Sequence, residues 1–289
     1  MAATKIYDCF CYFDEDLILE LRFETLWNVV DYFVISEAAY SHAGTARPLH
    51  FDIDRFAKYK DKIRYLPLHE RPAGENNSWK NENFIRNNLA RGLDDAGEND
   101  LILISDLDEI PNPARIAAYD PRYLRGDFEQ RYYSYYFNNY RLGEVDEQGK
   151  LIPGSQLHQG SKITTFRHFR DFFGSNASSV RIYKSSGLLR SLRRSWFRRF
   201  QRQVIADGGW HFTWIYDMDG IIRKIENTAH QEFNTPLYKN PERIREFILS
   251  GRDFHIPNSR YQVQPLDEQF PAYLLQQRER FKDFLAVVK

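Results

Sequence analysis

The stretch Leu101-Ile102-Leu103-Ile104-Ser105-Asp106-Leu107-Asp108-Glu109-Ile110-Pro111 decides the fold of this chain. Its four leading apolar residues predict a buried strand, and the acidic cluster after them predicts a turn at the carboxyl end of that strand. Asp106 and Asp108 are two residues apart, so on extended backbone their side chains can point the same way. Paired carboxylates are ligands that Mg²⁺ and Mn²⁺ prefer. The stretch therefore predicts a divalent-metal site at the edge of a sheet, and the alternative is an acidic turn that binds nothing.

The segments before this stretch alternate between strand and helix patterns. Strands are expected at residues 5–13, 29–36 and 63–68, and helices at residues 15–26 and 81–91. This alternation is typical of an α/β fold, in which helices flank a mostly parallel sheet. Ligands of such sheets bind outside the carboxyl ends of the strands, where Glu37 and the two aspartates fall.

The segments after the stretch are less regular. Strands are expected at residues 161–169, 179–184 and 208–214, and helices at residues 188–204 and 273–288. No linker separates the two halves, so we expect a single domain over residues 1–289 with an elaborated C-terminal half.

The composition excludes several classes of protein. The 289 residues contain 40 Lys and Arg against 40 Asp and Glu, so net charge gives no reason to expect nucleic acid as a partner. The two cysteines, Cys9 and Cys11, are two residues apart on one expected strand and are not expected to form a disulfide. No signal peptide and no apolar run of membrane-spanning length is apparent, so we expect a cytoplasmic protein.

Several motifs in a fixed order carry a family resemblance. They are Tyr7-Asp8-Cys9-Phe10, Leu17 to Arg22, Val30 to Glu37, the loop Ser41 to Leu49, the acidic stretch, the tyrosine-rich segment 130–141, Gly209-Trp210-His211, and the block from Lys224-Ile225-Glu226 through Ala229-His230-Gln231-Glu232. Over residues 5–235 the chain resembles glycosyltransferase family 17, the β-1,4-mannosyl-glycoprotein β-1,4-N-acetylglucosaminyltransferase family. Ser41-His42-Ala43 and the arginine-rich segment 190–202 depart from the family pattern.

The resemblance implies a GT-A-type fold and an inverting sugar transfer that depends on Mn²⁺ or Mg²⁺. The implied donor is a UDP-linked nucleotide sugar, specifically UDP-N-acetylglucosamine, and the implied acceptor is a glycan or a glycolipid. Residues 1–115 would then bind the donor, and residues 116–289 would form the acceptor side.

Candidate donor-side residues follow from this chemistry. Asp108 is expected to bind the metal directly, and Asp106 to bind either the metal or the ribose. The resemblance also implies a histidine ligand from the C-terminal half. We favour His211 over His230, because the glycines before His211 allow close approach to phosphate. Three further side chains are expected to bind the nucleotide: Glu37, Arg47 and Arg86. A loop ion pair for Glu37 and a solvated helix face for Arg86 are the structural alternatives.

Sugar transfer also needs a base that takes the proton of the acceptor hydroxyl. Glu232 and Asp217 are expected to supply it, because they are acidic residues in the acceptor-side block.

The arginine-rich segment predicts a basic amphipathic helix. Six arginines between residues 190 and 202 alternate with Leu189, Leu192, Trp196, Phe200 and Val204 at helical spacing. Such a helix binds anionic membranes or acidic glycans. Membrane binding would place the protein at the inner membrane surface and suit a lipid-linked acceptor. The alternative is an ordinary surface helix that packs its apolar residues inward.

Two other functions fit the acidic motif. An Asp-x-Asp phosphotransferase or phosphatase is disfavoured, because such sites usually have Thr or Val soon after the second aspartate, and here Glu109-Ile110-Pro111 follows. A non-catalytic glycan-binding protein on the same fold is the third possibility.

Overall fold

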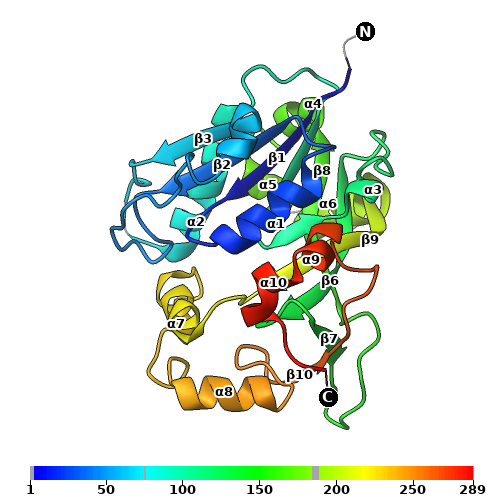
Figure 1. Ribbon diagram of the computed structural model, residues 1–289. Helices are drawn as coiled ribbons and strands as arrows, with labels where there is room; N and C mark the ends of the chain where they lie inside the picture. Colours follow the sequence, from blue (N-terminus) through cyan, green and yellow to red (C-terminus); the bar gives the residue numbers. More distant parts are fainter. Residues whose placement is uncertain (1–2, 75, 184–188, 289) are drawn as a thin grey trace.

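The computed structural model describes residues 3–74, 76–183 and 189–288. Its first half is a parallel sheet in the order β3-β2-β1-β4 (Figure 1). These strands are β1 (Ile6–Cys11), β2 (Tyr32–Ala38), β3 (Ile63–Leu68) and β4 (Leu101–Asp106). The expected α/β fold class is confirmed, with the acidic cluster at the carboxyl end of β4.

Strands of the second half extend the same sheet. β8 (Leu157–Thr165) pairs antiparallel with β4, and β6 (Arg125–Ser134) pairs antiparallel with β8. β7 (Asn139–Glu144) and β10 (Ser259–Val263) continue beyond β6. β9 (Arg202–Thr213) runs parallel to β6 and also pairs antiparallel with β5 (Glu109–Pro111). The strand after the acidic turn is therefore bound to the C-terminal half.

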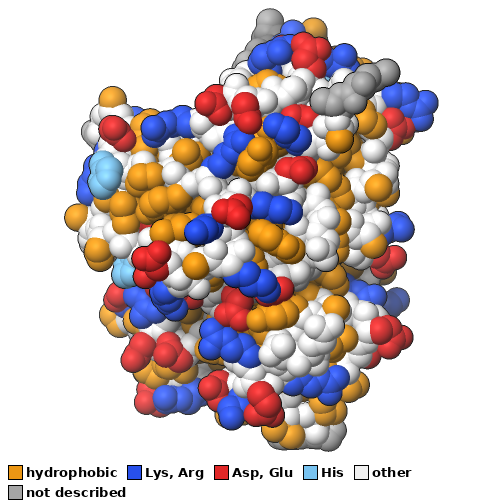
Figure 2. Space-filling model, turned by 45° about the horizontal axis from the view of Figure 1, so that its top comes forward, with side chains coloured by type: hydrophobic (Ala, Val, Ile, Leu, Met, Phe, Trp, Pro, Cys, Tyr) orange, Lys and Arg blue, Asp and Glu red, His pale blue; other side chains and the backbone are white. Residues whose placement is uncertain are grey.

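Helices cover both faces of this sheet (Figure 1). The longer ones are α1 (Asp16–Leu26), α2 (Ser78–Asn87), α7 (Met218–Asn227) and α8 (Pro241–Leu249). Shorter helices are α3 (Pro113–Ile116), α4 (Phe166–Asp171), α5 (Ala177–Arg181), α6 (Arg190–Trp196), α9 (Ala272–Gln276) and α10 (Arg278–Phe281). Among the described helices, none is long and apolar enough to cross a membrane. Figure 2 shows basic and acidic side chains interspersed over one face, as the balanced composition suggests.

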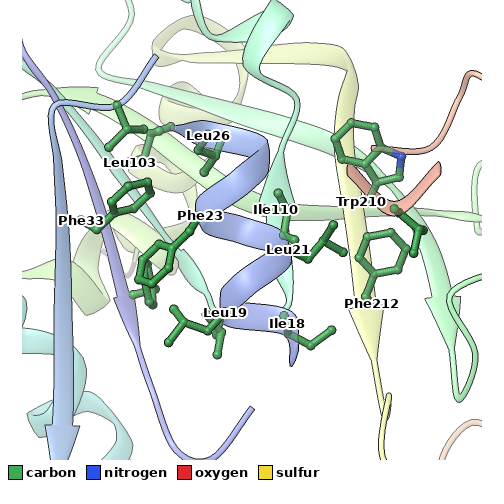
Figure 3. Close-up of a cluster of buried hydrophobic side chains, with 14 of the residues drawn as sticks. Ile18, Leu19, Leu21, Phe23, Leu26, Phe33, Leu103, Ile110, Trp210 and Phe212 are labelled. Carbon is green, nitrogen blue, oxygen red and sulfur yellow. The ribbon is translucent and has the colours of Figure 1, made fainter. Parts of the chain in front are cut away.

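The strand period of two sorts the core into two layers. On β1, Phe10 faces α1, whereas Tyr7 and Cys9 face the opposite side of the sheet. The α1 side is the larger layer, and it packs residues such as Phe23 and Leu103 together (Figure 3). Cys9 and Cys11 are free thiols, as predicted.

A buried ion pair joins α1 to the sheet. Arg22 has no exposed side-chain surface and donates to both carboxylate oxygens of Asp8, at 2.8 and 2.6 Å. It also donates to the backbone carbonyls of Asp106, Leu107 and Glu109 at 3.1, 3.0 and 2.9 Å. One arginine thereby fixes the backbone of the acidic turn.

Three expected elements of the second half are wrong. Residues 179–184 were expected as a strand, but Ala177–Arg181 is helical because the Asn176 side chain caps its N-terminus at 2.8 Å; residue 184 lies outside the described residues. The helix expected at 188–204 ends earlier, since a π turn (Phe197–Gln201) leads into β9, which pairs with β6; residue 188 lies outside the described residues. The terminal helix expected at 273–288 is broken at Gln277 into α9 and α10.

Replacing Arg22 should destabilise the fold severely. Arg22→Leu leaves the Asp8 carboxylate buried without a cation, which should lower the free energy of unfolding by about 3–5 kcal/mol. Arg280→Leu is the matched control, because Arg280 pairs with Glu20 at the surface and is 58% exposed; it should cost less than about 1 kcal/mol. Urea denaturation measures both, and equal losses would contradict the assigned role.

Candidate functional site

A cavity of about 520 Å³ opens at the carboxyl ends of β1, β2 and β4. Its walls come from both halves of the chain: the β1–α1 loop, α2 and the acidic turn on one side, and β8, α5, β9 and α7 on the other. This is where an α/β sheet places its ligands.

Asp106 stands at the cavity wall between two arginines. One carboxylate oxygen accepts from Arg86 of α2 at 3.0 Å, and the other accepts from Arg181 of α5 at 2.8 Å. The Asp106 side chain remains 42% exposed, so a ligand can reach it. The two guanidinium groups are therefore positioned beside any anion that enters.

Asp108 contacts the C-terminal half of the chain. Its Oδ2 lies 3.3 Å from Lys224 Nζ of α7, and its Oδ1 lies 3.5 Å from His211 Nε2 of β9. Burial opposes ionisation of this carboxyl, but Lys224 and His211 outweigh burial and hold its pKa below the usual range. Asp108 is therefore an anion at neutral pH, as a metal ligand must be.

Glu109 is a buried residue of the cavity wall. Arg181 binds both of its carboxylate oxygens, and His158 Nε2 lies 2.9 Å from its Oε1. Burial raises the pKa of Glu109, but Arg181 and His158 have the larger combined effect and keep it well below the usual value. The Glu109 side chain also accepts from the backbone amide of Asp106 at 3.0 Å, so it orients the acidic turn.

Glu109, His158 and His211 form a cluster that could hold a metal ion. One ligand atom from each lies within 4.8 Å of the others. The His211 Nδ1 is buried and has no hydrogen-bond partner among the described residues. With Asp106 and Asp108 beside it, the cluster offers carboxylate oxygens and imidazole nitrogens, a donor set that suits Mn²⁺. The residues present therefore fit a divalent ion.

Gly209 brings His211 to the acidic turn. Its φ is +124°, and a Cβ at this position would lie 2.2 Å from the Ile110 carbonyl oxygen. The sequence suggested that the glycines before His211 allow close approach to phosphate. The structure instead uses Gly209 for close approach to β5, which places His211 opposite Glu109.

Glu37 and Arg47 form one structural unit beside the cavity. Glu37 is fully buried and accepts from Arg47 at 2.9 Å, from two backbone amides of the following loop and from the Tyr65 hydroxyl. Glu37 is not among the described residues that line the cavity, so its contacts match the loop ion pair that was the structural alternative to nucleotide binding. Arg47 lines the cavity but also binds the Phe13 carbonyl and stacks on the Phe13 ring.

Asp217 and Glu232, the expected bases, lie outside the described cavity lining. Asp217 caps the N-terminus of α7 by accepting from Gly220 at 2.8 Å. Glu232 is 58% exposed and pairs with His230 at 2.7 Å. His230 lines the cavity, but it contacts Trp79 and Glu232 rather than the acidic turn.

Glu15 lines the cavity and was not selected from the sequence. Burial raises the pKa of its carboxyl, while the nearby Lys224 partly opposes the rise. A carboxyl with a raised pKa in a cleft is a candidate base. Its place in the acidic run Asp14-Glu15-Asp16, just after the first expected strand, was the available signal.

Arg181, His158 and Lys224 were also missed. Arg181 fell in a segment expected as a strand, and His158 lies in a segment without a motif. Lys224 belongs to a family motif block, which gave it no role. These side chains reach the cavity only through the arrangement of the second half of the chain.

Comparisons with known proteins agree with the motifs. Residues 1–142 match the model of Glycosyltransferase family 17, which confirms the resemblance. Beta-1,4-mannosyl-glycoprotein 4-beta-N-acetylglucosaminyltransferases of Rattus norvegicus and Homo sapiens are each 24% identical to this chain. The alignments cover 93% and 91% of this chain and 52% of each relative, so the chain spans about half the length of these curated relatives.

Solved structures resemble the chain only loosely. The galactosyltransferase LgtC, in complex with donor and acceptor sugar analogs, has a TM-score of 0.35 and 11% identity over 98% of this chain and 97% of its own. The glycosyltransferase GlyE of Streptococcus pneumoniae has a TM-score of 0.31 and 12% identity over 98% of this chain and 60% of its own. At these scores we draw no inference about the site from them.

Gly209→Ala should destabilise the protein, because the new Cβ collides with β5 as well as straining the backbone. We expect a loss of at least about 2 kcal/mol in the free energy of unfolding. Gly154→Ala is the control: Gly154 has a φ of +80°, but a Cβ there meets nothing within 4 Å. Urea unfolding should show a clearly larger loss of unfolding free energy for Gly209→Ala than for Gly154→Ala. Equal losses would mean that backbone strain alone explains the effect and that the contact with β5 contributes nothing.

Proposed function

We propose that this chain, whose residues 1–142 match glycosyltransferase family 17, is a metal-dependent glycosyltransferase. It moves a sugar, N-acetylglucosamine in this proposal, from a UDP-linked donor to a hydroxyl of a glycan acceptor. The observation that carries the proposal is the meeting of Asp106, Asp108 and His211 with three cationic side chains in one cavity. The names of the curated relatives support the choice of sugar.

Asp108, Asp106 and His211 are the residues that would hold the divalent ion. When bound, such an ion neutralises the diphosphate that leaves with the nucleotide. Glu109 and His158 belong to the same cluster of donor atoms. Glu109 orients the turn through its bond to the Asp106 amide, so its main task is to position the metal ligands.

Arg86, Arg181 and Lys224 are the cations that would face the diphosphate. Each of them is bound to a carboxylate of the acidic turn. Arginine suits phosphate because its planar N–H groups match phosphate oxygens in pairs. We therefore assign Arg86 and Arg181 to the donor phosphates, with Lys224 between the donor and acceptor sides.

Glu15 is the base that the cavity geometry favours. It faces the cavity close enough to Lys224 and Asp108 for both to affect its pKa. Asp217 and Glu232 stay predictions, although neither is part of the described cavity lining. In this assignment the Glu15 carboxylate takes the proton of the acceptor hydroxyl as that oxygen attacks the sugar.

Metal and donor should bind cooperatively, because the cavity is charge-balanced. Its described lining has five cationic side chains (Arg47, Arg86, Lys162, Arg181, Lys224) and five acidic ones (Glu15, Glu82, Asp106, Asp108, Glu109). A divalent cation alone or a diphosphate alone upsets this balance by about two charges, whereas the pair restores it. UDP and Mn²⁺ should each raise the affinity of the other about tenfold or more in calorimetric titrations.

Asp108→Asn should abolish this coupling while the protein remains folded. Asp94→Asn is the control, because the Asp94 side chain is 84% exposed and is absent from the cavity lining. Thermal melting with UDP and Mn²⁺ should show a shift for wild type and for Asp94→Asn only. Absence of a response to UDP and other nucleotides in wild type would refute the proposal. Binding with no sugar transfer to any acceptor would favour the non-catalytic glycan-binding alternative.

The pH dependence of kcat/KM should identify the base. Glu15 must be deprotonated to act, and burial raises its pKa, so activity should fall on the acid side at a pH above the ordinary glutamate pKa of about 4.3. Glu15→Gln should lower kcat by roughly 10²–10⁴-fold and remove that limb of the profile. Glu232→Gln is the matched comparison. If Glu232→Gln has the larger effect, the base assignment moves to Glu232.

A further inference from the structure

An exposed apolar surface lies on α6 and the segment that follows it. It consists of Leu189, Leu192, Trp196, Phe200 and Val204, whose exposed fractions are 55, 65, 45, 56 and 42%. Soluble proteins seldom expose such a group of large apolar side chains together, and where they do it marks an interaction site. We call this group the α6 surface.

The helix holds these side chains away from the protein body. Leu189, Leu192, Trp196 and Phe200 are spaced three or four residues apart, so they share one side of the helical segment. The buried residue of the segment is Phe197, which stacks on Tyr183 at 4.3 Å and lies 5.1 Å from the Arg125 guanidinium. The inward packing considered from the sequence is therefore wrong for α6, in which no described residue is buried.

The charge around the α6 surface has one sign. From Leu189 to Ala206 the sequence contains six arginines and neither Asp nor Glu, although the whole chain has a formal net charge of zero. Arg194, Arg198 and Arg199 are exposed among the apolar side chains. An anionic partner that also offers an apolar phase satisfies both features.

We propose that the α6 surface binds the interface of a bilayer that contains anionic lipid. Leu, Trp and Phe would enter the boundary between headgroups and acyl chains, while the arginines bind the headgroup phosphates. A second copy of this chain fits worse, because a two-fold contact would bring the two arginine clusters together. An acidic polysaccharide would bind the arginines but would leave the apolar side chains exposed.

The α6 surface lies next to the wall of the cavity. Arg181 and Ile182 line the cavity, and the next residue, Tyr183, stacks on Phe197 beneath α6. Ile182 is itself 59% exposed. A bilayer on the α6 surface would therefore lie near the cavity, which suits an acceptor glycan carried on a lipid. This last step rests on the proposed glycosyltransferase function, whereas the docking itself does not.

Vesicle flotation of the full chain tests the docking, with neither metal nor donor added. Wild type should float at low salt with phosphatidylcholine vesicles that contain phosphatidylglycerol, and should stay unbound with phosphatidylcholine alone. Arg194→Ser with Arg198→Ser should weaken binding roughly 25-fold, since each charge near an anionic surface contributes about fivefold. Leu192→Ser with Trp196→Ser and Phe200→Ser should weaken it about tenfold or more, because three apolar side chains no longer insert.

The control variant removes three exposed apolar side chains elsewhere on the protein. Leu237, Leu249 and Val287 are 53, 86 and 85% exposed, and replacing all three with serine should leave vesicle binding unchanged. The proposal is overturned if wild type ignores anionic vesicles, or if the α6 triple variant binds them as wild type does. It is also overturned if wild type sediments as a dimer that this triple variant converts to a monomer, or if it binds heparin beads but not vesicles.

The UDP and Mn²⁺ response separates this proposal from the proposed function. The α6 triple variant should keep the thermal shift of wild type, because none of its three replaced residues lines the cavity. Failure of flotation with an intact UDP response would reject the docking alone. If the function holds, the variant should lose activity on a lipid-presented acceptor more than on a soluble one.

Discussion

The buried ion pair between Arg22 and Asp8 is the interaction on which the rest of this structure depends. The Arg22 guanidinium neutralises Asp8 in the middle of β1, and it also donates to the carbonyls of the acidic turn. A charge so deeply buried is tolerated only when its partners are complete, and here carboxylate, carbonyl and Ser105 hydroxyl oxygens all take part. The turn that presents Asp106 and Asp108 is therefore held from beneath by the core and does not depend on a ligand for its shape.

Cations from three helices compensate the acidic turn on its open side. Arg86 belongs to α2, Arg181 to α5 and Lys224 to α7, so elements remote in sequence meet at the three acidic residues of the turn. The charged side chains of the cavity lining balance, which limits the electrostatic cost of holding buried charges. An incoming diphosphate would find guanidinium groups already in place, and each one that it recruits must leave a carboxylate. Diphosphate binding would therefore exchange one anionic partner of each guanidinium group for another and would not add new charge pairs.

The features that could be predicted from the sequence are those with a local sequence pattern or motif. The apolar run before Asp106 and the alternating segments around it were enough to predict the parallel half of the sheet. His211 could be selected through the family motif, and the structure places it 3.5 Å from Asp108. Arg181 and His158 could not be found, because their place in the cavity depends on how β8 and α5 follow the sheet. For Glu37 the local signal was misleading. Its position at a strand end suggested ligand binding, but both of its carboxylate oxygens accept hydrogen bonds from neighbouring residues of the protein.

The insertion of β8 between β4 and β6 has a consequence for the order in which the chain can fold during synthesis. Residues 1–142 include β4 and β6, but these two strands are not neighbours, and β8 (Leu157–Thr165) must fill the space between them. A nascent chain that has left the ribosome through residue 142 therefore has β4 with one edge unpaired. β5 likewise waits for β9, which ends at Thr213. The acidic turn can thus acquire its final surroundings only after three quarters of the chain has been translated, and until then an apolar strand edge is open to chaperones or to pairing with another chain.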